Sequence, residues 1–162
     1  LLDISYNKSN ATIIVVDNRT TAMTGHQDHP GTGKTLMGDE AVEASISAIG
    51  KACGVHRTRE VYPYDLKETE RVLNEEIDAD EPSLIVSKAP CILKERKDVD
   101  AKRKIDFDKC KNCKACLKLG CPAIEASVSK PEINAYLCVG CGLCEQVCTF
   151  GAIEAVEDTN GR

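Results

Sequence analysis

The chain has 162 residues, which is enough for one domain of ordinary size or for two small ones. Its composition, 42% hydrophobic and 29% charged, is typical of a globular protein. A net charge of −5 argues against nucleic acid as a partner and gives no basic face for a membrane surface. The longest aliphatic run, Ile13 to Val16, is too short to span a bilayer, and the first residues show no signal-peptide pattern.

Residues 1–93 alternate between strand and helix patterns. Residues 11–16 (ATIIVV) form a short β-branched run, and we predict a buried strand there. A polar loop follows, and a helix is then predicted from Asp39, as its N-cap, to about Cys53. Gly54 suits the position that ends this helix. The apolar stripe of the helix comprises Val42, Ile46, Ile49 and Cys53.

A second strand is predicted at residues 55–62 and a third at residues 82–89. Between them, Asp65 and Glu68 resemble a capping box that starts a second helix. The apolar face of that helix comprises Leu66, Val72, Leu73 and Ile77. Strands that alternate with helices indicate an α/β domain, with a parallel sheet and covering helices. Three strands make a thin sheet and the chain opens on Leu1, so we expect more of this domain upstream.

Charge dominates residues 94–104 (KERKDVDAKRK). Nine of these eleven residues are charged, and six of the nine are basic. Such a run is typical of a solvated linker, and we place the domain boundary here. The alternative is a docking surface for an acidic electron carrier.

Residues 105–162 contain an internal repeat. The segment IDFDKCKNCKAC, which begins at Ile105, aligns with INAYLCVGCGLC, which begins at Ile133, and AIEA occurs in both halves. We therefore predict that each half consists of a short strand, a cysteine loop, a brief helix and a second short strand. The repeat also predicts pseudo-twofold symmetry and two copies of one site.

Eight of the ten cysteines belong to this repeat, in the motifs C-x2-C-x2-C-x4-C-P and C-x2-C-x2-C-x3-C. Three thiolates at this spacing surround one corner of a [4Fe–4S] cubane, and in two-cluster ferredoxins the other motif supplies the fourth ligand. One cluster is therefore assigned to Cys110, Cys113, Cys116 and Cys148. The other is assigned to Cys138, Cys141, Cys144 and Cys121. The pattern predicts an α+β, bacterial-type ferredoxin domain over residues 105–162.

Two other uses of cysteine fit this pattern less well. Zinc sites use paired C-x2-C motifs, but zinc gives no reason for three cysteines at this spacing twice, nor for Pro122 after the fourth. A disulfide framework is typical of secreted chains, and the spacing with the missing signal instead indicates a reducing cytoplasm. The motifs depart from the bacterial pattern in the longer gap before Cys121 and in Thr149, where proline is usual. Cys53 and Cys91 stand apart, and we predict that both are buried structural thiols.

The stretch DHPGTGKT resembles a nucleotide-binding P-loop. Gly33, Lys34 and Thr35 match the second half of that motif, but Asp28 occupies the position of its first glycine. A carboxylate there would point charge and bulk at the phosphates. A P-loop also follows its strand directly, whereas the predicted strand here ends near Val16. We therefore do not predict an ATP site.

The segment VVDNRTTAMTGHQDHPGTG, residues 15–33, offers another interpretation when it is combined with the two cysteine motifs. The combination resembles the thiamine-diphosphate-dependent 2-oxoacid:ferredoxin oxidoreductases, and within them most closely the alpha subunits of the indolepyruvate branch. The resemblance covers essentially the whole chain. It implies that residues 1–93 are the C-terminal part of a thiamine-diphosphate-binding domain.

The resemblance also implies a site for Mg²⁺ and diphosphate that has two halves. The first half is a Gly-Asp-Gly sequence, which does not occur before Asn18 in this chain and would lie upstream. The second half is the Asn18 amide with the backbone carbonyl of Thr20, because hard Mg²⁺ prefers oxygen ligands. His26 is implied as a catalytic contact to the 2-oxoacid or the thiazolium; for His26 and His29 the alternative is ordinary loop polarity. Further residues implied to contact the cofactor are Thr24, Gly25 and Gln27.

The function that this resemblance implies is oxidative decarboxylation of arylpyruvates to acyl-CoA. The implied partners are a beta subunit, the 2-oxoacid, coenzyme A and an external ferredoxin that receives electrons from the two clusters. One alternative is a non-enzymatic ferredoxin-type electron carrier joined to a degenerate α/β domain. Another is an oxidoreductase of the same family that acts on a different 2-oxoacid.

Overall fold

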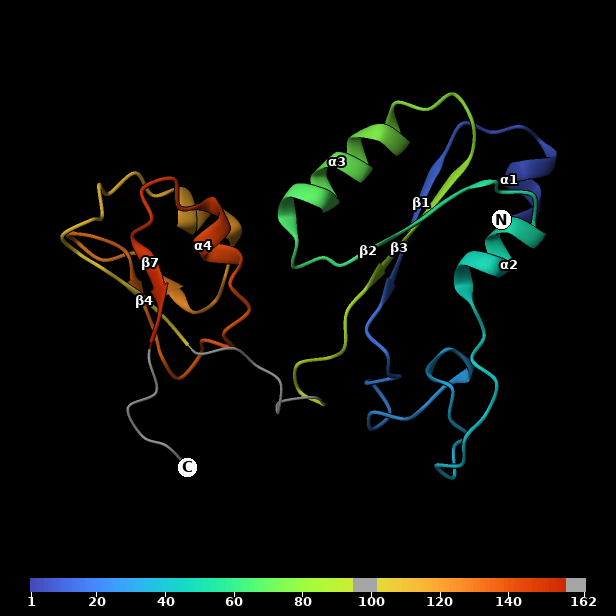
Figure 1. Cartoon of the computed structure of the whole chain (residues 1–162), viewed down its shortest axis with the longest axis horizontal. Coiled ribbons are helices and arrows are strands. Elements are labelled where there is room, and N and C mark those ends of the chain that lie inside the picture. Colours follow the sequence, from blue (N-terminus) through green and yellow to red (C-terminus); the bar gives the residue numbers. More distant parts are fainter. Residues whose placement is uncertain (95–101, 157–162) are drawn as a thin grey trace. The chain divides into compact units, whose positions relative to one another are not determined.

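The computed structural model describes residues 1–94 and 102–156. The chain divides into two compact units, Leu1–Lys94 and Glu95–Arg162, and each is described by itself (Figure 1). The first unit has helices and a parallel sheet, and the second is a small unit of short strands and helices. Among the helices of the described part, none has the length and apolar character needed to cross a membrane.

A three-stranded parallel sheet forms the centre of the first unit. β1 spans Thr12–Asp17, β2 spans Arg57–Val61, and β3 spans Ser83–Lys88 and lies between the other two. The three predicted strands and their parallel pairing are confirmed, and their ends lie close to the predicted ones. Because the strands are parallel, their carboxyl ends meet at one edge of the sheet.

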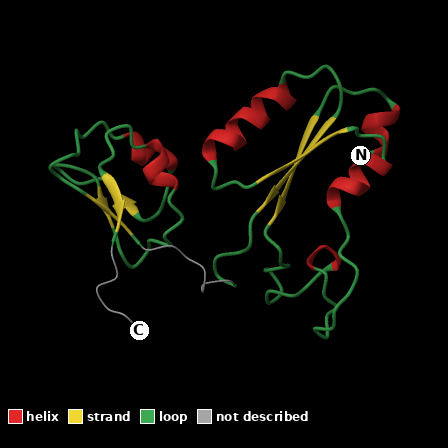
Figure 2. Cartoon of the chain, in the orientation of Figure 1, coloured by secondary structure: helices red, strands yellow, loops and turns green. Residues whose placement is uncertain are grey.

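Helices cover both faces of this sheet, as Figures 1 and 2 show. The covering helices are α2 (Ile46–Ala52) and α3 (Leu66–Ile77), whereas the short α1 (Leu2–Tyr6) precedes β1. Successive side chains of β3 point to opposite faces. Leu84 therefore packs in a cluster with Ile46 of α2, whereas Ile85 packs with Val72 of α3. The core of the unit thus consists of two apolar layers, one on each side of β3.

α2 begins later than the sequence pattern predicts. Ser45, and not Asp39, is its N-cap, and the Ser45 hydroxyl accepts a hydrogen bond from the Ala48 N–H at 3.1 Å. The residues before it are not helical, because the Ala41 N–H donates to the Gly33 carbonyl at 2.9 Å. Pairing with the preceding loop therefore replaces the first helical turns. As a result Val42, placed in the predicted apolar stripe, is 93% exposed.

Glycines define the middle and the end of α2. A Cβ at Gly50 would lie 2.4 Å from Leu84 Cδ2, so the absence of a side chain lets the helix approach β3 closely. Gly54 has φ of +88° and follows the helix in the left-handed region, as predicted.

α3 starts where the sequence predicts. The Asp65 carboxylate accepts a hydrogen bond from the Glu68 N–H at 3.0 Å and caps the helix. Val72 is buried against the sheet, whereas Ile77, predicted for the same face, is 60% exposed. The side chain that instead becomes fully buried near the end of the helix is Glu76, which pairs with two arginines of β2.

The second unit has the symmetry that the repeat predicts. β4 (Arg103–Ile105), the first strand of the first half, pairs antiparallel with β7 (Ile153–Ala155), the last strand of the second half. β5 (Ile124–Glu125) and β6 (Glu132–Ile133) pair in the same way. The brief helices of the two halves are η3 (Ala115–Leu119) and α4 (Leu143–Val147).

The predicted linker, residues 94–104, falls largely outside the described part of the chain, which lacks residues 95–101. Its last two residues, Arg103 and Lys104, belong to β4. The first strand of the second unit therefore begins inside the charged run.

Candidate functional site

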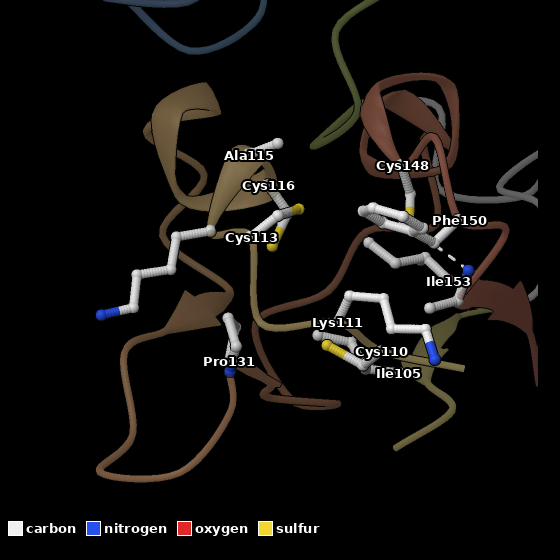
Figure 3. A pocket seen from close by; sticks show the side chains of 12 residues that line it. Ile105, Cys110, Lys111, Cys113, Ala115, Cys116, Pro131, Cys148, Phe150 and Ile153 are labelled. Atoms are coloured by element: carbon white, nitrogen blue, oxygen red, sulfur yellow. Dashed lines mark hydrogen bonds between the residues drawn. The ribbon is translucent and has the colours of Figure 1, made fainter. Parts of the chain in front are cut away.

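Four cysteines line one cavity of the second unit, and they come from both halves of the repeat. Cys110, Cys113 and Cys116 belong to the first motif, whereas Cys148 follows α4 in the second. Figure 3 shows the sulfur-bearing side chains of these residues around one central space. The cavity, which is open to solvent, measures about 350 Å³. The fold thus gathers the four residues that the sequence assigns to one cluster.

A second cavity, of about 570 Å³, has the complementary set of cysteines. The four that line it are Cys138, Cys141, Cys144 and Cys121. The Arg103 N–H donates to Cys138 Sγ at 3.4 Å, and the Ala152 N–H donates to Cys148 Sγ at 3.3 Å in the first cavity. Hydrogen bonds to sulfur favour the thiolate form, which is the form that binds metals.

The two cysteine loops share an uncommon backbone conformation. In the first loop Asn112 and Lys114 have φ of 53° and 60°, a region that non-glycine residues rarely adopt. The repeat aligns these positions with Gly140 and Gly142, which both have φ of 75°. Glycine adopts this conformation without steric cost. The left-handed residues turn the chain between the cysteines, so that three closely spaced thiols face one cavity.

Burial favours the protonated form of two thiols of the metal-free chain, those of Cys144 and Cys116. Desolvation, with added repulsion from the thiolates of Cys141, Cys138 and Cys121, raises the pKa of Cys144 from 9.0 to about 11. Burial also raises the pKa of Cys116 in the first cavity. A bound metal cluster would supply the positive charge that the buried thiolates lack, and its binding would release protons.

Apolar side chains pack beside both cavities. Ile124, Ile153 and Cys144 form the buried centre of the second unit. Partly buried residues pack around this centre, namely Ile105, Cys116, Leu117, Leu119, Cys121, Ile133 and Cys148. Four of the eight motif cysteines therefore belong to the apolar core itself.

Within residues 1–94 and 102–156, no three His, Cys, Asp or Glu side chains converge as the ligands of a single metal ion. The thiolates of a cubane bind different irons, so they surround a volume and need not converge on one point. The arrangement of four cysteines around each cavity has this form.

In the first unit, a turn after β1 positions the residues implied in Mg²⁺ binding. Asn18 Oδ1 accepts a hydrogen bond from the Thr20 N–H at 3.2 Å, and Asp17 Oδ1 accepts one from the Arg19 N–H at 2.8 Å. Arg19 has φ of 58°, and the two side-chain bonds hold this strained turn. The Asn18 carbonyl accepts the Cys91 N–H at 2.9 Å, which ties the turn to the chain after β3.

The remaining residues of the implied cofactor loop lie in an exposed hairpin. Thr21 and Gln27 pair through two backbone hydrogen bonds, of 2.9 and 3.1 Å. Thr24, Gly25 and His26 lie at the tip and are exposed. In contrast, His29 Nδ1 accepts the Gly31 N–H at 3.1 Å, so this histidine stabilises the short η1 helix (Pro30–Thr32).

The stretch that resembles a P-loop folds as a small hairpin. The backbones of Lys34 and Glu40 form an isolated antiparallel β-bridge, and the Thr35 N–H donates to the Asp39 carbonyl at 2.9 Å. A P-loop would place Lys34 and Thr35 at the start of a helix. The next helix here begins only at Ile46.

A polar cavity at the carboxyl end of the sheet was not anticipated from the sequence. It measures about 270 Å³ and lies beside the Asn18 turn. Glu43 Oε1 accepts from Arg19 at 3.0 Å and from Lys88 at 3.2 Å, and the two cations lower the pKa of Glu43. The sequence did contain one indication of this cavity, because Asp17 and Lys88 are the last residues of neighbouring parallel strands. Such positions commonly hold ligand-binding groups.

Family comparison bears on the first unit directly. Residues 1–87 match the model described as thiamine pyrophosphate enzyme, C-terminal TPP binding domain. The chain belongs to the thiamine pyrophosphate enzymes. Residues 131–154 match the model of the 4Fe-4S binding domain, which indicates an iron–sulfur cluster in the second unit.

Several curated proteins resemble this thiamine pyrophosphate enzyme over nearly all of its length. The indolepyruvate oxidoreductase subunit IorA of Methanothermobacter thermautotrophicus is 37% identical over 155 residues, which is 95% of this chain and 25% of that protein. IorA of Pyrococcus horikoshii is 37% identical over 98% of this chain and 26% of its own length. IorA of Archaeoglobus fulgidus is 32% identical over 95% of this chain and 26% of its own length. The chain thus spans about a quarter of the length of these relatives.

The two cysteines outside the repeat differ from the prediction in their burial. Cys53 and Cys91 are only partly buried, and neither forms a disulfide bond. Cys53 follows the last residue of α2 and is the C-cap of that helix. In this thiamine pyrophosphate enzyme, Cys91 matters through its backbone N–H, which binds the Asn18 carbonyl.

Proposed function

We propose that this chain is the C-terminal part of an indolepyruvate oxidoreductase subunit whose second unit passes electrons through two [4Fe–4S] clusters. The observation that supports this best is the crossed arrangement of the cysteines. Each cavity is lined by three cysteines of one motif and one of the other, so each has the four thiolate donors that a cubane requires. The longer gap before Cys121 and the Thr149 substitution leave this donor count intact.

The residues around both cavities suit iron–sulfur clusters. Soft thiolates are the preferred ligands of such clusters, and N–H groups close to sulfur with an apolar surrounding are the features that tune them. Here, backbone N–H groups donate to the sulfurs of Cys138 and Cys148, and the apolar core around Ile124 and Ile153 provides the apolar surrounding. The cluster ligands in this proposal are the two sets of four cysteines predicted from the spacing.

The Asn18 turn suits half of a Mg²⁺ and diphosphate site. One lone pair of Asn18 Oδ1 accepts the Thr20 N–H, and the second remains for a metal ion. The Thr20 side chain is buried and donates to the Gln27 carbonyl at 3.3 Å, which orients the Thr20 main chain. Asn18 and the Thr20 carbonyl are therefore proposed as Mg²⁺ ligands. Thr24, Gly25, Gln27 and His26 are proposed to close over the cofactor and the 2-oxoacid.

The proposed reaction converts an arylpyruvate and coenzyme A to CO2 and an acyl-CoA, and releases two electrons and one proton. When bound, thiamine diphosphate would supply the stabilisation of negative charge on the substrate carbon after CO2 leaves. The role of the present chain is to hold half of that cofactor's metal site and to lead electrons away, one at a time, to an external ferredoxin. A beta subunit completes the proposed complex, and we place it in the reducing cytoplasm.

Two alternatives remain. A non-enzymatic ferredoxin-type carrier would have the same clusters but no thiamine dependence, even with the upstream sequence restored. An oxidoreductase that acts on another 2-oxoacid would have both cofactors but would not favour arylpyruvates.

The decisive experiment is anaerobic purification with iron and sulfide analysis and EPR after reduction. We expect about eight irons per chain and the spectrum of two interacting [4Fe–4S] clusters. Tightly bound zinc without iron would refute the proposal. The thiamine half is tested by Mg²⁺-dependent binding of thiamine diphosphate to the chain extended upstream. Asn18→Ala should weaken this binding and Asn7→Ala, an exposed control, should not; no binding at all would favour the electron carrier.

A further inference from the structure

The two cysteine cavities differ in the charge of the loops that cover them. Lys111 and Lys114 line the first cavity, and both side chains are exposed. The repeat places Val139 and Gly142 at the corresponding positions of the second cavity, where neither has a charge. The two halves of the repeat are therefore similar in backbone but differ in the charge beside their cavities.

The two lysines are available to an outside partner. In the described part of the chain, neither Lys111 nor Lys114 forms an ion pair, whereas neighbouring Lys109 lies 3.1 Å from Asp106 and 3.3 Å from Glu154. Lys104 also lies 3.3 Å from Glu154, so Lys104 and Lys109 together compensate these two carboxylates within the unit. Asp108 is the remaining acidic residue of this loop, so positive charge is in excess at the first cavity.

Phe150, 47% exposed, is an apolar residue of the first cavity, and the second cavity differs in that none of the described residues lining it is both exposed and charged. Its charged wall residue, Arg103, is buried and pairs with Glu145 at 2.8 Å. The exposed residues at its rim are apolar, with Leu137 at 51% and Val139 at 41% exposure. Apolar rims are typical of surfaces covered permanently, whereas transient electron-transfer contacts are small and depend on charge for their association rates.

We infer that the first cavity is the electron exit, and that Lys111 and Lys114 steer a small acidic iron–sulfur protein to it. This inference rests on the proposed function, because it requires a cluster in each cavity. A cluster held by Cys110, Cys113, Cys116 and Cys148 would, when reduced, supply the one electron that the oxidised acceptor takes up. No covalent bond forms or breaks. Cys113 lines the cavity and is exposed, so the cavity lies close to the protein surface at this residue.

The test is the second-order rate at which the reduced, cluster-loaded chain reduces a small acidic two-cluster ferredoxin, measured by stopped flow. The variants are Lys111→Glu, Lys114→Glu and the double change. Lys102→Glu is the matched control, because Lys102 is exposed and precedes Arg103, which lines the other cavity. Iron content, EPR spectra and reduction of uncharged benzoquinone report separately on cluster integrity in every variant.

We expect the double variant to react about tenfold more slowly at low ionic strength, and each single variant to fall between it and the unsubstituted chain. The difference should vanish near 1 M salt, where charges are screened beyond about 3 Å. Benzoquinone reduction and Lys102→Glu should be unaffected. Equal losses in all variants, or no loss in the double variant, would overturn the inference while leaving the proposed function intact. An unsubstituted chain that binds no cluster would overturn both.

Discussion

Arg103, which lines the second cysteine cavity, has its Nε 2.8 Å from Glu145 Oε1. The Arg103 side chain is 8% exposed and that of Glu145 is 33% exposed, so the ion pair is largely withdrawn from water. Arg103 begins β4 and Glu145 belongs to α4. The pair therefore connects the two halves of the repeat beside a proposed cluster.

Breaking this ion pair should destabilise the second unit. Glu145→Gln leaves the buried Arg103 charge without its carboxylate, and we expect a loss of about 3 kcal/mol in unfolding free energy. Arg103→Gln should cost less, about 1–2 kcal/mol, because Glu145 reaches water more easily. Anaerobic denaturant titration of the cluster-loaded chain measures both. The double variant should cost less than the two single losses combined, and strict additivity would contradict the coupling.

The crossed ligand sets make a prediction about pairs of cysteine variants. Cys113→Ser and Cys148→Ser should each lower the iron content from about eight to about four, and so should the two together, because both residues serve one cluster. Cys141→Ser combined with Cys148→Ser should remove nearly all iron, since each change destroys a different cluster. Iron and sulfide analysis distinguishes the two pairs, with Cys53→Ser as the control. If each motif held its own cluster, the Cys113 and Cys148 pair would remove nearly all iron, and the Cys141 and Cys148 pair would leave about four irons.

The raised pKa of Cys144 predicts a pH dependence of the metal-free chain. The folded chain keeps the thiol proton up to about pH 11, whereas the unfolded chain loses it near pH 9.0. Alkylation of Cys144 by iodoacetamide, followed by mass spectrometry, should therefore reach half its maximum rate at a higher pH in buffer than in urea. By linkage, this thiol stabilises the metal-free fold below pH 9 and the contribution is lost as the pH rises toward 11. Coincident profiles in buffer and urea would contradict this burial.

Glu76 should be essential to the stability of the first unit. Its side chain is fully buried, and its carboxylate lies 2.8 Å from Arg57 and 3.0 Å from Arg59. Glu76→Gln removes the buried negative charge that the two arginines share and leaves Arg57 only the longer contact with Glu81, at 3.7 Å. We expect a loss of about 3 kcal/mol in urea denaturation. Glu75→Gln is the matched control on the surface of the same helix, with an expected change of about 0.5 kcal/mol or less. Similar losses in both variants would show that the burial of Glu76 contributes nothing.

The sequence predicted those elements whose determinants are local. The β-branched run of β1 and the Asp65 cap of α3 both form where expected, because neighbouring residues suffice to specify them. The start of α2 was predicted wrongly, since backbone pairing of Ala41 with Gly33 competes with helix formation and involves residues that no helical pattern includes. The burial of Glu76 was missed for the same reason: its partners lie on β2, and α3 alone gives no sign of them.

For the candidate sites, the sequence by itself determined the chemistry, and the tertiary structure decided the geometry. Cysteine type and spacing identify thiolate ligands and suggest two clusters, because three thiols at this spacing can surround one corner of a cubane. Only the fold brings Cys148 beside Cys110 and Cys121 beside Cys138, through the pairing of β4 with β7 and of β5 with β6. Only the fold sets Lys111 and Lys114, which form no ion pair within the described residues, at one cavity, and at the other the buried Arg103 beside the partly buried Glu145. Charge can be counted in a sequence, but whether a charge is neutralised depends on which residues long-range packing places within reach of it.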